Sequence, residues 1–153
     1  MKENRHGAHT VFEIHLHIVW VTKYRRAVLT PEIGLRLRDL IRDICRAEQV
    51  TVMKGHVSKD HVHIMVSIPP QLAISNLVQK LKGKSAYKLL GEFPKLRKQY
   101  WGGHLWARGF FCRSSGNVTD EIIKQYIANQ THDADEDFRV EGEDSPYGET
   151  PSS

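Results

Sequence analysis

The stretch that most constrains the fold is the run DHVHIMVSIP at residues 60–69. It is apolar and rich in β-branched residues, which is typical of a buried strand. Side chains two residues apart on a strand point to the same face, so His61 and His63 lie side by side while Val62 and Ile64 turn to the other face. Two neutral imidazoles at this separation can bind one divalent metal ion. A pair of structural histidines packed on a sheet is the alternative, and this stretch alone does not decide between the two.

The rest of the chain alternates strand and helix patterns. Apolar, β-branched runs predict strands at 11–21, 50–57, 60–69 and 105–113, and helical periodicity predicts helices at 30–49, 75–90 and 119–130. The order is β-α-β-β-α-β-α, and its first six elements match the split-βαβ plan. We therefore predict an α+β, ferredoxin-like (RRM-like) antiparallel sheet with an extra C-terminal helix, in which the histidine strand is central.

Charge divides the chain into two parts. Residues 1–131 carry a net charge of +11, whereas residues 132–153 carry −7. A basic body suggests a polyanionic partner, most often nucleic acid. The acidic segment is polar and without periodicity, so we expect one domain at 1–131 followed by a disordered tail at 132–153.

A basic loop follows the first predicted strand. It places Tyr24 among Lys23, Arg25 and Arg26. An aromatic ring between cations suits a single-stranded nucleic acid, because the ring can stack on a base while the cations contact phosphates. A solvated surface loop would look similar, so the four residues are candidate DNA contacts only.

Several sequence features bear on the compartment. No run approaches the roughly 20 apolar residues that span a bilayer, and the polar N-terminus shows no signal peptide. Cys45 and Cys112 lie far apart in the sequence and do not suggest a disulfide framework. We expect both thiols to be buried and the protein to be cytoplasmic, without a membrane partner.

The last predicted helix carries Tyr126 and Gln130, which are one turn apart on the same face. Each is unremarkable alone, since tyrosines on helices usually pack with the hydroxyl at the surface. Together with a two-histidine strand they form a chemical set: a tyrosine hydroxyl can attack a DNA phosphate that a divalent metal polarises. Two imidazoles and one amide oxygen leave coordination positions open for phosphate and water.

The motifs WVTKYRRAVL, DHVHIMV, LWARGFFCRSSGNVT and EIIKQYIANQ follow one another in this order. Over about residues 11–131 the chain resembles the single-tyrosine HUH transposases of minimal bacterial insertion sequences (TnpA-type). The resemblance implies an enzyme of a bacterial or archaeal cell that cuts and rejoins single-stranded DNA at hairpins. By that pattern Tyr126 forms a 5′-phosphotyrosine, and His61, His63 and Gln130 hold Mg²⁺ or Mn²⁺. It also implies a homodimer, in which the tyrosine helix of one subunit can complete the histidine site of the other.

Rival residues and rival functions remain. His15 and His17 form a second His-x-His, to which the resemblance gives a supporting or core role. Tyr24, Tyr87 and Tyr100 are alternative nucleophiles, but none has an amide side chain one helical turn away. The alternative functions are a non-enzymatic single-stranded nucleic-acid-binding module, with bases stacked on exposed aromatics of the sheet, and a domesticated relative that processes genomic hairpin repeats.

Overall fold

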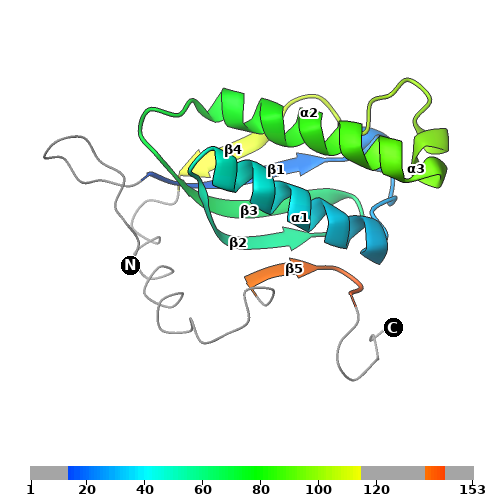
Figure 1. Ribbon diagram of the computed structural model, residues 1–153, viewed down its shortest axis with the longest axis horizontal. Coiled ribbons are helices and arrows are strands. Elements are labelled where there is room, and N and C mark those ends of the chain that lie inside the picture. The colour runs from blue at the N-terminus through cyan, green and yellow to red at the C-terminus, as the bar shows by residue number, and fades with distance from the viewer. Residues whose placement is uncertain (1–13, 115–136, 144–153) are drawn as a thin grey trace, which may run out of the picture.

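The computed structural model describes residues 14–114 and 137–143, which form a single sheet with helices packed against one side of it (Figure 1). The strands are β1 (Ile14–Val21), β2 (Thr51–Val57), β3 (His61–Ile68), β4 (Phe111–Ser114) and β5 (Phe138–Val140). The helices are α1 (Pro31–Ala47), α2 (Ile74–Glu92) and α3 (Pro94–Gln99), with a short 3-10 turn, η1 (Lys23–Arg25), after β1. The predicted helix at 119–130 lies outside the described residues.

The strand order is β4-β1-β3-β2-β5. β3 pairs antiparallel with β1 and β2, and β1 pairs antiparallel with β4. This arrangement confirms the ferredoxin-like plan and the central position of the histidine strand. β5 pairs with β2 in parallel, so the complete sheet is mixed rather than purely antiparallel.

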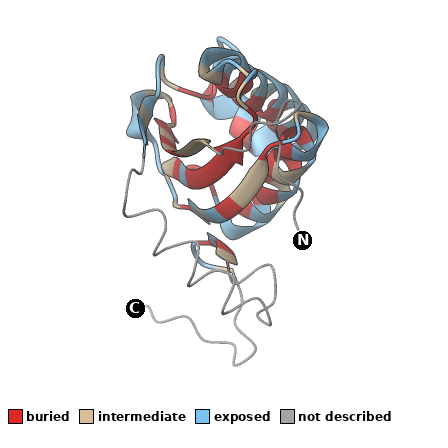
Figure 2. Cartoon of the chain, turned by 90° about the vertical axis from the view of Figure 1, so that its left-hand side faces the viewer, coloured by how far each residue is buried: buried red, intermediate tan, exposed pale blue. Residues whose placement is uncertain are grey.

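The core lies between the sheet and the two long helices, where the buried residues of both layers face one another (Figure 2). α1 begins as predicted, because the Thr30 hydroxyl accepts a hydrogen bond from the Ile33 amide at 3.3 Å and Pro31 occupies the first turn. The fully buried side chains of this core include Ile18, Trp20, Leu37, Ile41, Ile64, Ile68, Leu77, Leu81 and Leu89. The opposite face of the sheet is therefore left to the alternate residues of each strand.

The predicted strand at 105–113 is wrong over most of its length, because only Phe111–Ser114 forms β4. Trp106 makes an isolated bridge to Thr22 instead. Its indole N–H donates to the Ser85 hydroxyl at 3.0 Å, so the apolar character of this segment reflects packing in the core. Gly109, with φ of +79°, then turns the backbone before β4 begins.

The prediction of a disordered tail is wrong for residues 137–143. Phe138 and Val140 are 2% and 3% exposed and belong to the core. They fit because glycine leaves room opposite them: a Cβ atom on Gly55 would meet the Phe138 ring, and one on Gly34 would meet Val140. An acidic segment with low apolar content thus forms a strand because its two apolar side chains pack over glycines that have no side chain.

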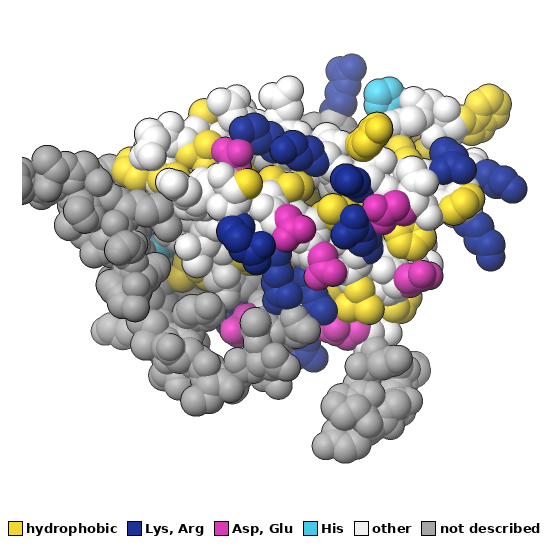
Figure 3. Space-filling model, in the orientation of Figure 1, with side chains coloured by type: hydrophobic (Ala, Val, Ile, Leu, Met, Phe, Trp, Pro, Cys, Tyr) yellow, Lys and Arg dark blue, Asp and Glu magenta, His cyan; other side chains and the backbone are white. Residues whose placement is uncertain are grey.

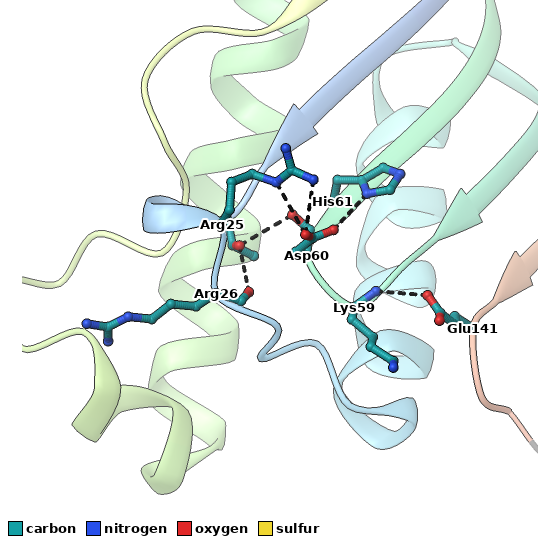
Figure 4. Close-up of polar contacts among 7 residues, drawn as sticks. Arg25, Arg26, Lys59, Asp60, His61 and Glu141 are labelled. Atoms are coloured by element: carbon teal, nitrogen blue, oxygen red, sulfur yellow. Dashed lines mark hydrogen bonds and ion pairs between the residues drawn. The ribbon is translucent and has the colours of Figure 1, made fainter. Parts of the chain in front are cut away.

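The acidic residues of this segment also have specific partners. The buried Arg38 guanidinium donates to the Phe138 carbonyl at 2.9 Å and to the Glu143 carboxylate at 3.2 Å. The Glu141 carboxylate accepts from the Lys59 amide at 3.1 Å (Figure 4). These contacts fix β5 to α1 and to the turn before β3.

Both cysteines are free. Cys45 is buried, as predicted, but the prediction is wrong for Cys112, which is only half-buried because β4 is an edge strand. Within the described ranges, no helix combines the length and apolar character that crossing a membrane requires.

Candidate active site

The site is built on the face of the sheet that turns away from α1 and α2. In the antiparallel register of β1 and β3, His61 lies opposite Val21 and His63 opposite Val19. Val62 and Ile64 are completely buried on the helix side. The predicted separation of the two histidines from the aliphatic residues of their strand is confirmed.

Asp60 orients the first histidine. Its Oδ1 lies 2.9 Å from Nδ1 of His61, and because a carboxylate accepts, Nδ1 carries a proton; in the neutral ring Nε2 is then the nitrogen with the lone pair. Arg25 donates to the other carboxylate oxygen from Nε at 3.3 Å and from Nη2 at 3.1 Å (Figure 4). The hydrogen bond from His61, followed by that from Arg25, holds the pKa of Asp60 below its ordinary value. A histidine that binds a metal ion through one ring nitrogen commonly donates the N–H of its other ring nitrogen to a carboxylate.

The η1 turn brings Arg25 to this position. Tyr24 and Arg25 both have left-handed backbone angles, with φ of 64° and 53°, which non-glycine residues adopt only when surrounding contacts hold them there. Thr22 supplies such contacts, since its amide donates to the Asp60 carbonyl at 2.9 Å and its hydroxyl to the Arg26 carbonyl at 2.8 Å. Arg25 consequently faces Asp60 while the Tyr24 ring remains 70% exposed.

One member of the second histidine pair, His17, contacts the first pair. Nδ1 of His17 lies 3.1 Å from Nε2 of His63, with the ring centroids 5.2 Å apart. Burial, and then the charge of Arg113, lower the pKa of His17. His15 lies two residues further along the same face of β1, opposite Ser67. The supporting role expected for this pair agrees with the contact of His17.

The electrostatics of His63 favour its neutral form. Burial is the main cause that lowers its pKa, and the neighbouring His17, His61 and His56 add to the effect. His56 belongs to β2 and lies directly opposite His63 in the register. A histidine that stays neutral at pH 7 can donate a ring nitrogen to a metal ion.

Among the described residues, only the two histidines of β3 are candidates for metal ligands. Across 14–114 and 137–143, no group of three or more histidine, cysteine, aspartate or glutamate residues is placed to hold a metal ion. His61 and the neutral His63 can each offer one ring nitrogen to a divalent cation, although Nε2 of His63 is engaged by Nδ1 of His17 at 3.1 Å. Gln130, the predicted third ligand, and Tyr126, the predicted nucleophile, lie outside the described residues.

The positions of Tyr87 and Tyr100 do not favour nucleophilic attack. Tyr87 is on α2, which packs on the side of the sheet away from the histidines. Burial raises the pKa of Tyr100, and its hydroxyl donates to the Lys23 carbonyl at 3.1 Å, so its phenolate is scarce. The Tyr24 ring lies beside the Arg26 guanidinium and the Lys23 ammonium, 5.2 and 5.4 Å from its centroid, which keeps Tyr24 among the candidate DNA contacts.

Comparison with known proteins decides the family. Residues 10–130 match the family model of IS200-like transposases. This chain belongs to the IS200-like transposase family. It is 36% identical over 131 residues to the ISDra2 transposase TnpA of Deinococcus radiodurans, a match that covers 86% of this chain and 93% of the relative. It is also 30% identical over 151 residues to the IS200 transposase of Salmonella typhimurium, a match that covers 99% of this chain and 97% of that relative.

Solved structures agree with this transposase assignment. The crystal structure of a putative transposase from Deinococcus radiodurans has a TM-score of 0.68 and 35% identity, over 85% of this chain and 98% of that one. A REP-associated tyrosine transposase bound to a REP hairpin shares the fold, with a TM-score of 0.56 and 16% identity over the whole of both chains. The family resemblance seen in the sequence is confirmed, and the chain is a transposase, an enzyme that cleaves DNA and transfers strands.

Sequence reasoning missed two parts of this transposase site. The sequence analysis predicts no role for Asp60, although an acidic residue directly before a candidate ligand histidine is a usable signal for an orienting carboxylate. Arg25 was grouped with three DNA-contact candidates, but its ion pair with Asp60 spans 35 positions in the sequence and leaves no local pattern.

Proposed function

We propose that this transposase cleaves and rejoins single-stranded DNA at hairpin-marked ends of a mobile element through a 5′-phosphotyrosine on Tyr126. The observation that carries the proposal is the pair His61 and His63 on one sheet face, with Asp60 fixing the proton of His61 on Nδ1. Family membership supports the reaction class. The hairpin bound by the REP-associated tyrosine transposase of the same fold supports the form of the substrate.

The chemistry consists of two substitutions at phosphorus. The hydroxyl oxygen of Tyr126 attacks the scissile phosphate, the bond to the 3′ oxygen breaks, and that strand leaves with a free 3′-OH. The 3′-OH of another strand then attacks the phosphotyrosine and releases the tyrosine. One phosphodiester is broken and one is formed, so no nucleotide triphosphate is required.

His61, His63 and Gln130 would hold the divalent cation, Mg²⁺ or Mn²⁺. When bound, the cation withdraws electron density from the scissile phosphate and favours the phenolate of a nearby tyrosine. Asp60 keeps the lone pair of His61 directed outward, and the low pKa of His63 keeps that ring available at neutral pH. Lys23, Tyr24, Arg25 and Arg26 are the proposed DNA contacts next to this site.

A labelled single-stranded hairpin substrate tests the proposal directly. With Mg²⁺ or Mn²⁺ present, the protein should form a covalent adduct that survives denaturing electrophoresis, and the released strand should carry a free 3′-OH. EDTA should abolish both products. Absence of an adduct with either metal, or equally efficient cleavage of a perfect duplex, would contradict the proposed reaction.

We also propose that the enzyme acts as a homodimer and that the tyrosine can act in trans. Mixing Tyr126→Phe protein with His61→Ala protein, under conditions that exchange subunits, should restore part of the cleavage, because one hybrid site then has both intact parts. Subunit exchange is verified separately with two differently labelled proteins. Verified exchange without any restored cleavage would show that the tyrosine acts in cis.

A further inference from the structure

A concave site lies beside the η1 turn, and neither the family assignment nor the metal site accounts for it. This cavity, the η1–α3 pocket, has a volume of about 370 Å³ and lies between the turn after β1 and the segment around the end of α3. Its main lining residues are Lys23, Tyr24, Arg26, Lys98, Tyr100 and Trp101. The volume is at the lower end of ligand pockets, which suits one planar ring system rather than a folded partner.

The pocket carries exposed aromatic surface. Trp101 is 87% exposed and Tyr24 is 70% exposed. In the part of the chain that the structure describes, no ring or cation stacks on the indole of Trp101. A large aromatic left in water beside a cavity marks a binding surface, since its burial against a partner is favourable.

The wall of the pocket is already ordered. The Arg26 guanidinium lies between two tyrosine rings, 5.2 Å from the centroid of Tyr24 and 5.3 Å from that of Tyr100. The same guanidinium donates to the Gln99 carbonyl, and the Tyr100 hydroxyl donates to the Lys23 carbonyl. A ligand therefore meets a prearranged surface and need not order it on binding.

The charge of the pocket selects an anionic ligand. Lys23, Arg26 and Lys98 line it, and no carboxylate does so among the described residues. At the α3 end of the molecule, Lys and Arg side chains alternate with hydrophobic ones on the surface (Figure 3). Stacking rings among cations match a nucleotide, whose base is planar and whose phosphate is charged.

The pocket is linked to the metal site by one turn of chain. Tyr24 contributes to the pocket, while the adjacent Arg25 is ion-paired to Asp60, which orients His61. We propose that the η1–α3 pocket binds one unpaired base of the single-stranded flank that adjoins the cleaved phosphate, with the base stacked on Trp101. This inference rests on the proposed function, because the single-stranded DNA flank is part of the hairpin substrate proposed there.

Binding is measured separately from cleavage. Fluorescence anisotropy of a labelled hairpin with a single-stranded flank, in EDTA, reports affinity while the reaction is blocked. Trp101→Ala should weaken binding by roughly 5- to 150-fold, the effect of losing one stacked base. Tyr24→Ala, which removes a ring that the Arg26 guanidinium packs against, should also weaken binding. Trp101→Tyr should retain most of the affinity. Tyr87→Ala, which removes a comparably exposed tyrosine from α2, is the matched control and should bind like the parent.

Base removal locates the contact. Abasic substitution along the flank should weaken binding to the parent at one position, and Trp101→Ala should abolish the sensitivity at that position. If Trp101→Ala and Tyr24→Ala bind the flank as tightly as the parent, with unchanged circular dichroism, the pocket does not bind DNA. If the pocket variants bind normally and the parent protein still forms the covalent adduct, only this inference is overturned. If the parent protein forms no adduct, the proposed function is overturned.

Discussion

At the scale of single residues, the contact between Asp60 and His61 would orient one ligand of the proposed metal site. Asp60→Asn keeps the shape of the side chain but removes the charge that fixes the His61 proton on Nδ1. Loss of such a supporting carboxylate typically weakens metal affinity 10- to 100-fold. We expect that decrease in calorimetric titrations with Mn²⁺, with the fold intact by circular dichroism.

The matched control for this change is Asp43→Asn, because Asp43 is an exposed carboxylate on α1 paired with Arg46. The control should titrate like the parent. If Asp60→Asn also binds Mn²⁺ like the parent while His61→Ala does not bind it, Asp60 does not support the ligand.

Cys45 is a second residue whose environment has a measurable consequence. Burial, and then the charge of Glu48, raise the pKa of its thiol to about 12. In native Cys112→Ser protein at pH 8, Cys45 should therefore not react with Ellman's reagent until denaturant is added. Equal reaction rates with and without denaturant would show that Cys45 is accessible.

The same shift predicts the alkaline behaviour of the fold. The folded pKa of Cys45 lies above the unfolded value of about 8.5, so the folded state binds the thiol proton more tightly. The resulting contribution to stability is complete below that unfolded pKa and is lost as the pH rises toward 12.

At the scale of elements, β5 is the part of the sheet with the most unexpected origin. Phe138→Ala removes a ring that is 2% exposed and should lower the free energy of unfolding by about 3–5 kcal/mol. Arg139→Ala, in the same strand but exposed, should change it by less than about 0.5 kcal/mol. Urea denaturation of both variants measures the difference. Equal stability of the two variants would mean that β5 does not pack on the body.

Elements differ in how far the sequence predicts them, and the reasons are physical. β3 is predictable because an apolar, β-branched run is a local signal of a buried strand, and the alternation of His61, Val62 and His63 then follows from strand geometry. β5 has only three residues and an acidic setting, and it forms because Gly34 and Gly55, far away in sequence, leave space for its side chains. The strand predicted at 105–113 failed because Trp106 packs in the core without a ladder.

The candidate site divides in the same way. The shared face of His61 and His63 follows from strand geometry alone. The approach of His17 to His63 depends on the register between β1 and β3, and the ion pair of Arg25 with Asp60 depends on the η1 turn. Neither the register nor the turn leaves a periodic signal in the sequence.

At the scale of the whole molecule, the uneven charge predicts how DNA binding responds to salt. Residues 1–131 carry a net charge of +11. Each phosphate neutralised by lysine or arginine releases counterions, so the logarithm of the affinity should fall with the logarithm of salt concentration, with a slope of about 0.7–0.9 per contact. Anisotropy titrations at salt concentrations from about 50 to about 200 mM, over which phosphate contacts lose much of their affinity, measure the slope. A flat profile would show that the basic residues only solvate the surface.

The central claim is that Tyr126 is the nucleophile of a metal-dependent DNA strand transferase, and replacing that one hydroxyl tests it most directly. Tyr126→Phe removes a single oxygen, so hairpin DNA and Mn²⁺ should bind as they do to the parent. The covalent protein–DNA adduct and strand cleavage should both disappear on a denaturing gel, whereas Tyr87→Phe should leave them unchanged. If Tyr126→Phe protein still forms the adduct, another residue attacks the phosphate and the mechanism proposed here is wrong.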